Sequence, residues 1–256
     1  MNKLEDIINQ NDIDIFDEEE LEYIEELYDD LEMQMKELNK KQEETEKDII
    51  TFIALTILVF VVKNEFMTLS KGEQLKMNSQ INNKLNKTIT EKLEYTLDNL
   101  TLILSNTCRK TYKRYNMEIS ERKIKKLIKR SVNGSTLSKR VWNHENKLKK
   151  ELNDLLFKFY KGEISINDIK SKIQDRFKVE RYRIDNLIDD QIQKAYNEIR
   201  FEMFKKLHVK HVMRNSVFCL GTCEECAALH GTIYELDKAP EISIHCRCKC
   251  FYSIVD

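Results

Sequence analysis

The sequence contains very little glycine and proline, with five glycines and one proline in 256 residues. Turns and sheet corners depend on these two residues, so their scarcity argues against a fold with many tight connections. Lysine, glutamate, leucine, isoleucine and asparagine are abundant, which favours long helices joined by few connections. We therefore predict a mainly α fold, with an elongated helical body and a small C-terminal module that contains short β-strands.

Other features are missing as well. The chain has no phosphate-binding glycine loop, no nucleophile elbow and no H-E-x-x-H helix, so we expect no enzymatic activity. Its first residues, MNKLEDIINQ, contain no apolar signal segment. The longest uncharged run, residues 49–62, has fourteen residues, whereas a membrane-spanning helix needs about twenty. We expect no stable membrane span and interpret the run as a core helix; insertion into a membrane or protein channel during a triggered step is the alternative.

Charge is distributed very unevenly. Residues 1–50 hold nineteen acidic and five basic side chains, a balance of −14, and the remainder holds twenty-five acidic and thirty-eight basic side chains, a balance of +13. Such an acidic leader repels nucleic acid, whereas a basic body attracts phosphate or an acidic protein surface. We expect the two parts to have different partners, with solvated charged helix faces as the alternative.

The leader carries apolar residues at alternating steps of three and four, which predicts a short coiled-coil seam or helical hairpin. Because the seam covers fewer than three heptads, we expect it to pack against another helix of this chain or of a partner. The seam residues are Leu21, Ile24, Tyr28, Leu31, Met35 and Leu38.

Residues 109–130 form the most basic run, with ten basic and two acidic side chains. Ile124, Leu127 and Ile128 supply an apolar stripe at helical spacing, so we interpret the run as the solvated face of an amphipathic helix. Contact with nucleic-acid phosphates, with Tyr112 and Tyr115 available for stacking, is the alternative.

Residues 133–136, Asn-Gly-Ser-Thr, form the clearest internal loop, and three helices are predicted after it. The first carries the lone Trp142 as a packing anchor and ends at Gly162, a left-handed cap. Ser165 caps the second, and the third covers about 180–207. Their apolar residues recur at helical spacing: Leu148, Leu152, Leu155, Leu156, Phe159, Ile169, Ile173, Phe177, Ile184, Leu187 and Ile188.

Six of the seven cysteines fall in the last thirty-eight residues. Cys223 and Cys226 form a C-x-x-C pair, and His245 and Cys248 form an H-x-x-C pair after a gap of eighteen residues. Two such ligand pairs are typical of a tetrahedral zinc site, and three thiolates with one imidazole leave no open position, so we predict structural rather than catalytic Zn²⁺. Cys246 or Cys250 is an alternative ligand, and a pair of disulfides is the alternative chemistry. Cys108 and Cys219 are predicted to be small buried residues.

These patterns divide the chain into an acidic leader (1–48), a helical region with the apolar run (49–132), a helical domain (133–212) and a zinc-binding module (213–256).

From about residue 130 to residue 256 the order of motifs resembles the carboxyl half of the bacteriophage minor head proteins, also called Mu protein F-like head morphogenesis proteins. The matching positions are Ser138, Arg140, Gly162, Cys223, Cys226, Leu229, Gly231, His245, Cys248 and Cys250. Cys246 and Arg247 replace the family's usual Pro-Asn, and a second register places Cys246, Arg247 and Cys248 on its Cys-Arg-Cys.

The resemblance implies a minor capsid protein of the virion, made in the bacterial cytoplasm and located in the head interior or at the portal vertex. Its expected partners are the portal protein, the major capsid protein or both, with non-specific contact between the basic body and packaged DNA. It implies a role in head morphogenesis or DNA delivery. The alternative is a zinc-containing regulator that binds nucleic acid, although the tail from Cys219 carries only three basic residues, Lys238, Arg247 and Lys249.

Overall fold

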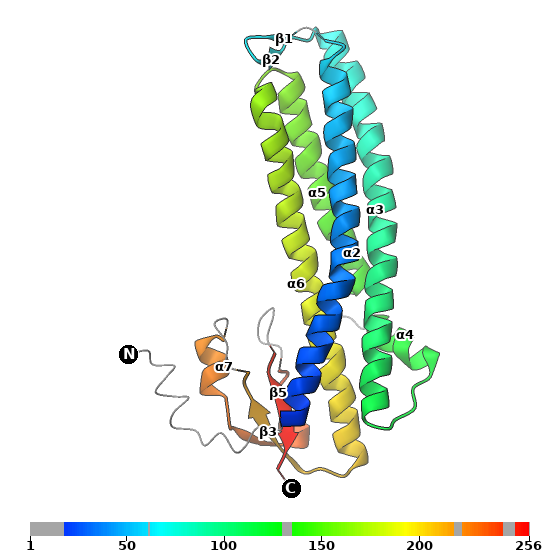
Figure 1. Cartoon of the computed structure of the whole chain (residues 1–256), viewed down its shortest axis with the longest axis vertical. Helices are drawn as coiled ribbons and strands as arrows, with labels where there is room; N and C mark the ends of the chain where they lie inside the picture. Colours follow the sequence, from blue (N-terminus) through cyan, green and yellow to red (C-terminus); the bar gives the residue numbers. More distant parts are fainter. Residues whose placement is uncertain (1–17, 61, 130–134, 218–221, 243–248, 256) are drawn as a thin grey trace. The chain divides into compact units, whose positions relative to one another are not determined.

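The computed structural model describes residues 18–60, 62–129, 135–217, 222–242 and 249–255. These residues form a mainly helical structure, 75% helix, with six α-helices and a small antiparallel sheet of three strands near the carboxyl terminus (Figure 1). The predicted fold class, mainly α with short β-strands in a C-terminal module, is confirmed.

The elements follow one another along the chain as long helices and short strands. In chain order they are α2 (Glu18–Ile57), β1 (Val62–Lys63), β2 (Phe66–Met67), α3 (Lys71–Arg114), α4 (Glu121–Lys129), α5 (Leu137–Tyr160), α6 (Ile166–Lys206), β3 (His211–Asn215), α7 (Glu224–Ala228), β4 (Ile233–Glu235), a 3-10 turn (Leu236–Lys238) and β5 (Phe251–Ile254).

Two predicted breaks between helices are absent. The leader and the first part of the apolar run form one helix, α2. The two helices expected after Ser165 are likewise a single helix, α6, of 41 residues. Neither glycine nor proline occurs within α6, so nothing in its backbone requires an interruption.

The helix ends follow local sequence signals. Gly162 adopts φ +75° after α5, and the amides of Gly162 and Glu163 donate to the carbonyls of Phe159 and Lys158, which is a Schellman cap, as predicted. Ser165 accepts from the Asp168 amide (3.1 Å) and caps α6, also as predicted. Trp142 was predicted to be a packing anchor, and this is wrong: its side chain is 54% exposed because it lies on the solvent face of α5.

The chain divides into two compact units. Unit 1 comprises Met1–Met33, Ile103–Ile128 and Asn186–Asp256, and unit 2 comprises Gln34–Leu102 and Lys129–Asp185. Each is described separately below.

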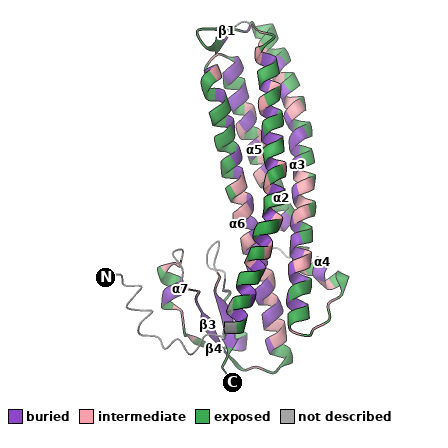
Figure 2. Cartoon of the chain, in the orientation of Figure 1, coloured by how far each residue is buried: buried purple, intermediate pink, exposed green. Residues whose placement is uncertain are grey.

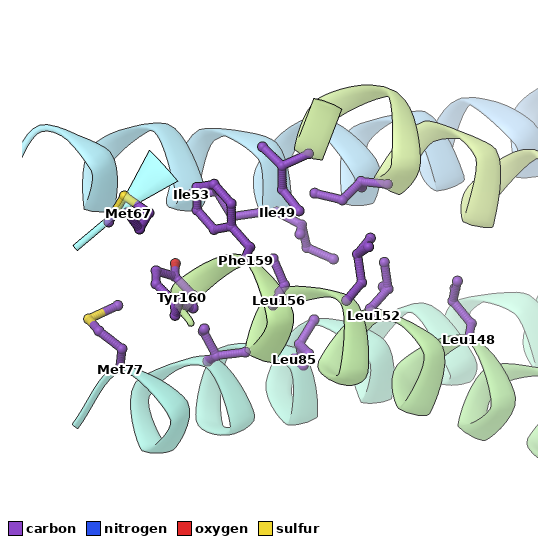
Figure 3. Close-up of a cluster of buried hydrophobic side chains, with 14 of the residues drawn as sticks. Ile49, Ile53, Met67, Met77, Leu85, Leu148, Leu152, Leu156, Phe159 and Tyr160 are labelled. Carbon is purple, nitrogen blue, oxygen red and sulfur yellow. The ribbon is translucent and has the colours of Figure 1, made fainter. Parts of the chain in front are cut away.

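Unit 2 has a hydrophobic core to which α2, α3, α5 and α6 all contribute (Figure 3). The predicted apolar stripes of α5 and the first half of α6 lie in this core, with Leu148, Leu152, Phe159 and Phe177 at 0% exposure. Seventeen buried residues form the cluster: Ile49, Ile53, Met67, Leu69, Met77, Ile81, Leu85, Ile89, Leu148, Leu152, Leu155, Leu156, Phe159, Tyr160, Ile169, Ile173 and Phe177.

The apolar run only partly follows the prediction of a core helix. Ile49 and Ile53 enter the core, but α2 ends at Ile57, and Leu58 and Val59 are 82% and 76% exposed. The run then enters the β1–β2 hairpin, and the region near β1 is coloured mainly as exposed (Figure 2). β-branched valines favour the extended chain, and Asn64 and Glu65 reverse it with positive φ angles. Within the described parts of the chain, no helix is both long and apolar enough to cross a membrane.

Unit 1 contains the first part of α2, the last part of α3, α4, the second half of α6 and the small sheet. Tyr23, Ile24 and Leu27 of α2 pack with Tyr196 and Phe251. Ile24, Leu31, Met35 and Leu38 are all buried and Tyr28 is partly buried, so the seam predicted for the leader is confirmed for these five side chains. The Leu21 side chain lies outside the described residues.

Part of the negative charge of the acidic leader is neutralised by ion pairs within each unit. Four leader carboxylates form ion pairs with cations from later in the chain: Glu20 with Arg200, Asp30 with Lys110, Glu46 with Arg181 and Asp48 with Lys84. The acidic leader is therefore a complementary surface for this chain's own basic body, as well as a candidate surface for a partner.

The basic run 109–130 is divided between the end of α3 and α4. Ile124 is buried, and Leu127 and Ile128 pack against its cluster, while Lys125 and Lys126 are exposed. The predicted apolar stripe and solvated face are confirmed on α4. Cys108 in the same cluster has 0% exposure, which confirms its prediction as a buried residue; Cys219 lies outside the described residues.

Candidate metal centre

The cysteine module is organised around β3, the central strand of the sheet order β4-β3-β5. Val212 pairs with Tyr234 on one side and with Ile254 on the other, both antiparallel. Strand alternation then places Val212 and Arg214 on the same face of β3. Both side chains have 0% exposure, and Met213 and Asn215 on the other face are also buried, so β3 is covered on both faces beyond His211.

The first cysteine pair opens the short helix α7. Cys223 is its N-cap, and the Cys223 sulfur accepts a hydrogen bond from the Cys226 amide (3.3 Å). This hydrogen bond orients the Cys223 sulfur at the start of α7. Cys223 has a free thiol, so no disulfide closes the C-x-x-C pair.

Cys250 joins this pair from the other end of the module. Cys223, Cys226 and Cys250 lie near one another, and all three belong to one apolar cluster with Phe204, Leu236 and Tyr252. Cys226 and Cys250 are 1% and 3% exposed. Two chain segments separated by more than twenty residues therefore bring three thiols to one buried location.

Arg214 is a fully buried cation beside these sulfurs. Its Nη2 lies 3.9 Å from the Cys226 sulfur and donates to the Ile242 carbonyl (3.2 Å). Burial by itself lowers the pKa of Arg214, but the charges of Cys250, Tyr252 and Cys226 outweigh burial and raise it. A buried guanidinium needs an anionic neighbour, and thiolates supply one.

The turn after α7 is fixed by backbone and histidine contacts. Gly231 has φ +74° and donates its amide to the Arg214 carbonyl (2.8 Å). His230 Nδ1 accepts from the Ser216 amide (3.1 Å), and burial lowers the pKa of His230 although nearby Cys250 acts in the opposite direction. His230 therefore orders the end of β3. Two other histidines near the cysteine module, His208 and His211, are exposed.

Two of the four predicted ligands, Cys223 and Cys226, are present in the module as described. The other two, His245 and Cys248, lie outside the described residues, as does Cys246. Among the residues that are described, no group of three histidine, cysteine or acidic side chains has the arrangement of a metal site. The ligand set thus remains a prediction, and Cys250 is the alternative ligand that the fold brings close to the pair.

The donor chemistry nevertheless fits zinc. Sulfur ligands, an amide directed at one of them and a cation beside another are the surroundings that stabilise bound thiolates. If Zn²⁺ binds, Cys223 and Cys226 supply one half of its tetrahedron, and the segment from 245 to 250 supplies the other half. The metal would then connect α7 to β5 and add folding free energy to a small module.

The module also contacts the helices of unit 1. Gln193 on α6 donates to the Cys250 carbonyl, and the Lys249 ammonium lies 4.5 Å from the centre of the Tyr28 ring on α2. Phe201 on α6 packs edge-on against Tyr252 (5.3 Å between ring centres). The cysteine tail is therefore part of the packed unit.

Arg214 is not among the site residues predicted from the sequence. The available signal was alternation: in the run His-Val-Met-Arg-Asn a strand places the arginine on the same face as Val212. Its partner sulfurs come from residues 226 and 250, which that local pattern does not specify.

No protein-family model, no curated protein and no solved structure matches this chain.

Proposed function

We propose that the chain is a minor head protein of a bacteriophage, bound at the portal vertex or inside the capsid, with a structural zinc site in its carboxyl-terminal module. The observation that carries the proposal is the gathering of Cys223, Cys226 and Cys250 beside β3, since these are cysteines of the motif that resembles the head morphogenesis family. Their donor chemistry supports a closed, structural metal site.

An exposed apolar surface in unit 2 supports a role in assembly. Leu55, Leu58, Val59 and Leu75 are 60%, 82%, 76% and 72% exposed and lie at or near the β1–β2 connection. Contiguous exposed apolar residues commonly mark protein interaction sites. We assign this surface, named here the apolar tip and defined by these four residues, to contact with a portal or major capsid protein.

The metal is tested by measuring zinc in the purified full-length chain. We expect about one Zn²⁺ per chain, with loss in Cys226→Ser and His245→Ala and retention in Cys108→Ala, a buried cysteine outside the module. Full zinc content in both module variants would refute the ligand set. Loss in Cys226→Ser and Cys250→Ser with retention in Cys248→Ser would assign the fourth ligand to Cys250 instead.

Assembly is tested by co-sedimentation with procapsids and by binding to purified portal protein. The variant with Leu58→Asp and Val59→Asp is expected to bind at least 10-fold more weakly, since burying two carboxylates in an interface costs several kcal/mol. Leu207→Asp, at a side chain of unit 1 that is 60% exposed, is the matched control and should bind normally. The assignment fails if the wild-type chain binds neither assembly.

Arg122, Lys125 and Lys126 are exposed on α4, so the proposed function includes non-specific contact between these side chains and packaged DNA. A salt titration separates the two functions: a head protein should show steeply salt-dependent binding without sequence preference, whereas a regulator should retain a preferred sequence.

A further inference from the structure

Among the buried polar side chains of unit 2 are four with a charged or amide group, one from each of its four long helices. They are Gln42 on α2, Lys92 on α3, Glu145 on α5 and Glu180 on α6, and none is more than 1% exposed. We name this set the polar layer. Residues of these types are rarely buried so completely unless they are paired.

Contacts between the helices place the four side chains at one level of unit 2. The Lys41 ammonium on α2 lies 5.9 Å from the centre of the Tyr95 ring on α3. Lys41 is next to Gln42 and Tyr95 is about one turn from Lys92, so Gln42 and Lys92 lie at a similar level. Arg181 bonds Glu46 (3.1 Å), which aligns α2 one turn from Gln42 with α6 next to Glu180. Lys92 bonds Glu145 directly.

The charges of the polar layer do not balance. Lys92 is the one buried cation among the four and bonds Glu145, while Glu180 has a contact with Arg183 on its own helix (3.4 Å). Arg183 is 20% exposed and also lies 3.7 Å from Glu151. Among the described residues, Glu180 Oε1, Glu145 Oε2 and both polar atoms of Gln42 have no hydrogen-bond partner. The one fully buried ammonium of the layer therefore bonds Glu145, while the ion pair of Glu180 is with the partly exposed Arg183.

We propose that Glu180 binds a proton in folded unit 2, so that the polar layer is a pH-responsive element that weakens the packing of the four helices when this proton leaves. A neutral Glu180 removes the excess negative charge, leaving the Lys92–Glu145 pair compensated. It also gives the layer an O–H donor among several acceptor oxygens.

The electrostatic surroundings agree with this assignment. Burial raises the pKa of Glu180 from the ordinary 4.5 to about 7, Glu145 adds to the increase, and Lys92 and Arg183 oppose it. Burial likewise raises the pKa of Glu145, against the effect of Lys92. The charged groups that act on Glu180 are therefore Lys92 on α3, Glu145 on α5 and Arg183 on α6, and on α2 the nearby carboxylate of Glu46 is paired with Arg181.

The direction of the pH dependence follows from the raised pKa. In the unfolded chain Glu180 ionises near pH 4.5, whereas in the folded chain it keeps its proton until about pH 7. Its contribution to stability is fully present below pH 4.5 and is lost as the pH rises to about 7. Above that range the loss is complete, and the contribution no longer changes.

The first test compares the melting temperature of full-length wild type and Glu180→Gln between pH 4.5 and pH 8.5. Glutamine mimics the protonated acid, so the variant should melt at about the wild-type temperature near pH 5 and ~5 °C higher at pH 8. Glu163→Gln, at an exposed glutamate, is the matched control and should follow the wild type throughout. A variant that melts lower than wild type by the same amount at every pH would overturn the proposal, as would unchanged pH dependence.

A second measurement uses only the wild-type chain and so does not depend on the folding of any variant. With glutamate side-chain carboxyl groups labelled with ¹³C, we expect the Glu180 resonance to titrate near pH 7 and the Glu145 resonance to titrate above its ordinary value, apart from the group of exposed glutamates that titrates near 4.5. If every glutamate resonance titrates below pH 6, Glu180 is ionised in the folded chain and the proposal is wrong.

Discussion

Both units bury carboxylates, and Glu20 in unit 1 has more hydrogen-bond and ion-pair partners than Glu145 or Glu180 in unit 2. In unit 1, Glu20 pairs with Arg200 (2.5 Å) and also accepts hydrogen bonds from the hydroxyl groups of Tyr115 and Tyr196. Arg200 in turn contacts the rings of Tyr196, Phe204 and Phe251. In unit 2, Lys92 bonds Glu145 and Arg183 lies 3.4 Å from Glu180, and each of the two carboxylates keeps one oxygen without a partner among the described residues.

Buried charges of the same residue types therefore have different effects on packing and on pH dependence in the two units. A buried charge with many partners fixes the packing of the segments that supply those partners. A buried charge with an incomplete set has a protonation state that responds to pH near neutrality. The Glu20 cluster is therefore a fixed anchor for the leader, and the polar layer is the titratable region.

The largest expected effect is in unit 1. Arg200→Met should lower the free energy of unfolding by ~3–5 kcal/mol, because it leaves Glu20 buried without its main cation. Lys110→Met is the matched control: Lys110 pairs with Asp30 at the surface with 48% side-chain exposure, and its loss should cost less than ~1 kcal/mol. Urea unfolding of both variants measures the difference. Equal losses would contradict the description of the Glu20 cluster as an anchor.

The next effect separates the two units by its dependence on pH. Lys92→Met leaves Glu145 and Glu180 without their buried cation, so both carboxyl groups should hold protons to higher pH than in the wild type. We expect a loss of ~3 kcal/mol at pH 8 and ~1 kcal/mol at pH 5, since protonation removes the uncompensated charge at the lower pH. Urea unfolding at the two pH values measures it. A loss that is larger at pH 5 than at pH 8 would contradict the proposed direction of the pH dependence.

The smallest effect should have the opposite sign. Gln42→Leu removes two buried polar atoms that have no partner among the described residues, so unit 2 should gain ~1 kcal/mol in free energy of unfolding. In unit 1 the corresponding change, Tyr196→Phe, removes a hydroxyl that bonds Glu20 and Arg200 and should cost ~1 kcal/mol. Thermal melting of the two variants compares them. A loss in Gln42→Leu would show that Gln42 has partners, such as buried water.

Much of the helical structure was predictable because its signals are local. The scarcity of glycine and proline predicted long helices, and Gly162 and Ser165 correctly predicted where α5 ends and α6 begins. The apolar stripe of α5 correctly predicted which side chains enter the core. Trp142 was predicted wrongly because aromatic character was used in place of its position on the helix.

For the candidate metal centre, sequence spacing identified the cysteine pair at 223 and 226, and the fold places Cys250 close to it. Spacing along the chain specifies which ligands can share one tight turn, and that was enough for Cys223 and Cys226. It does not specify which residue of a distant segment approaches them, because that depends on how β5 pairs with β3.

Local signals in the sequence were sufficient for the helical class, for the boundary between α5 and α6 and for most of the faces that become buried, since propensity, capping and periodicity act within a few residues. Only the tertiary structure decided which charges are buried and whether they are satisfied. Lys92, Glu145 and Glu180 have no local feature that distinguishes them from the exposed lysines and glutamates of the same helices. Apart from Arg183 next to Glu180, the charged neighbours of these three side chains lie 35 to 88 positions away along the chain, and burial among such distant segments raises the pKa of both carboxyl groups.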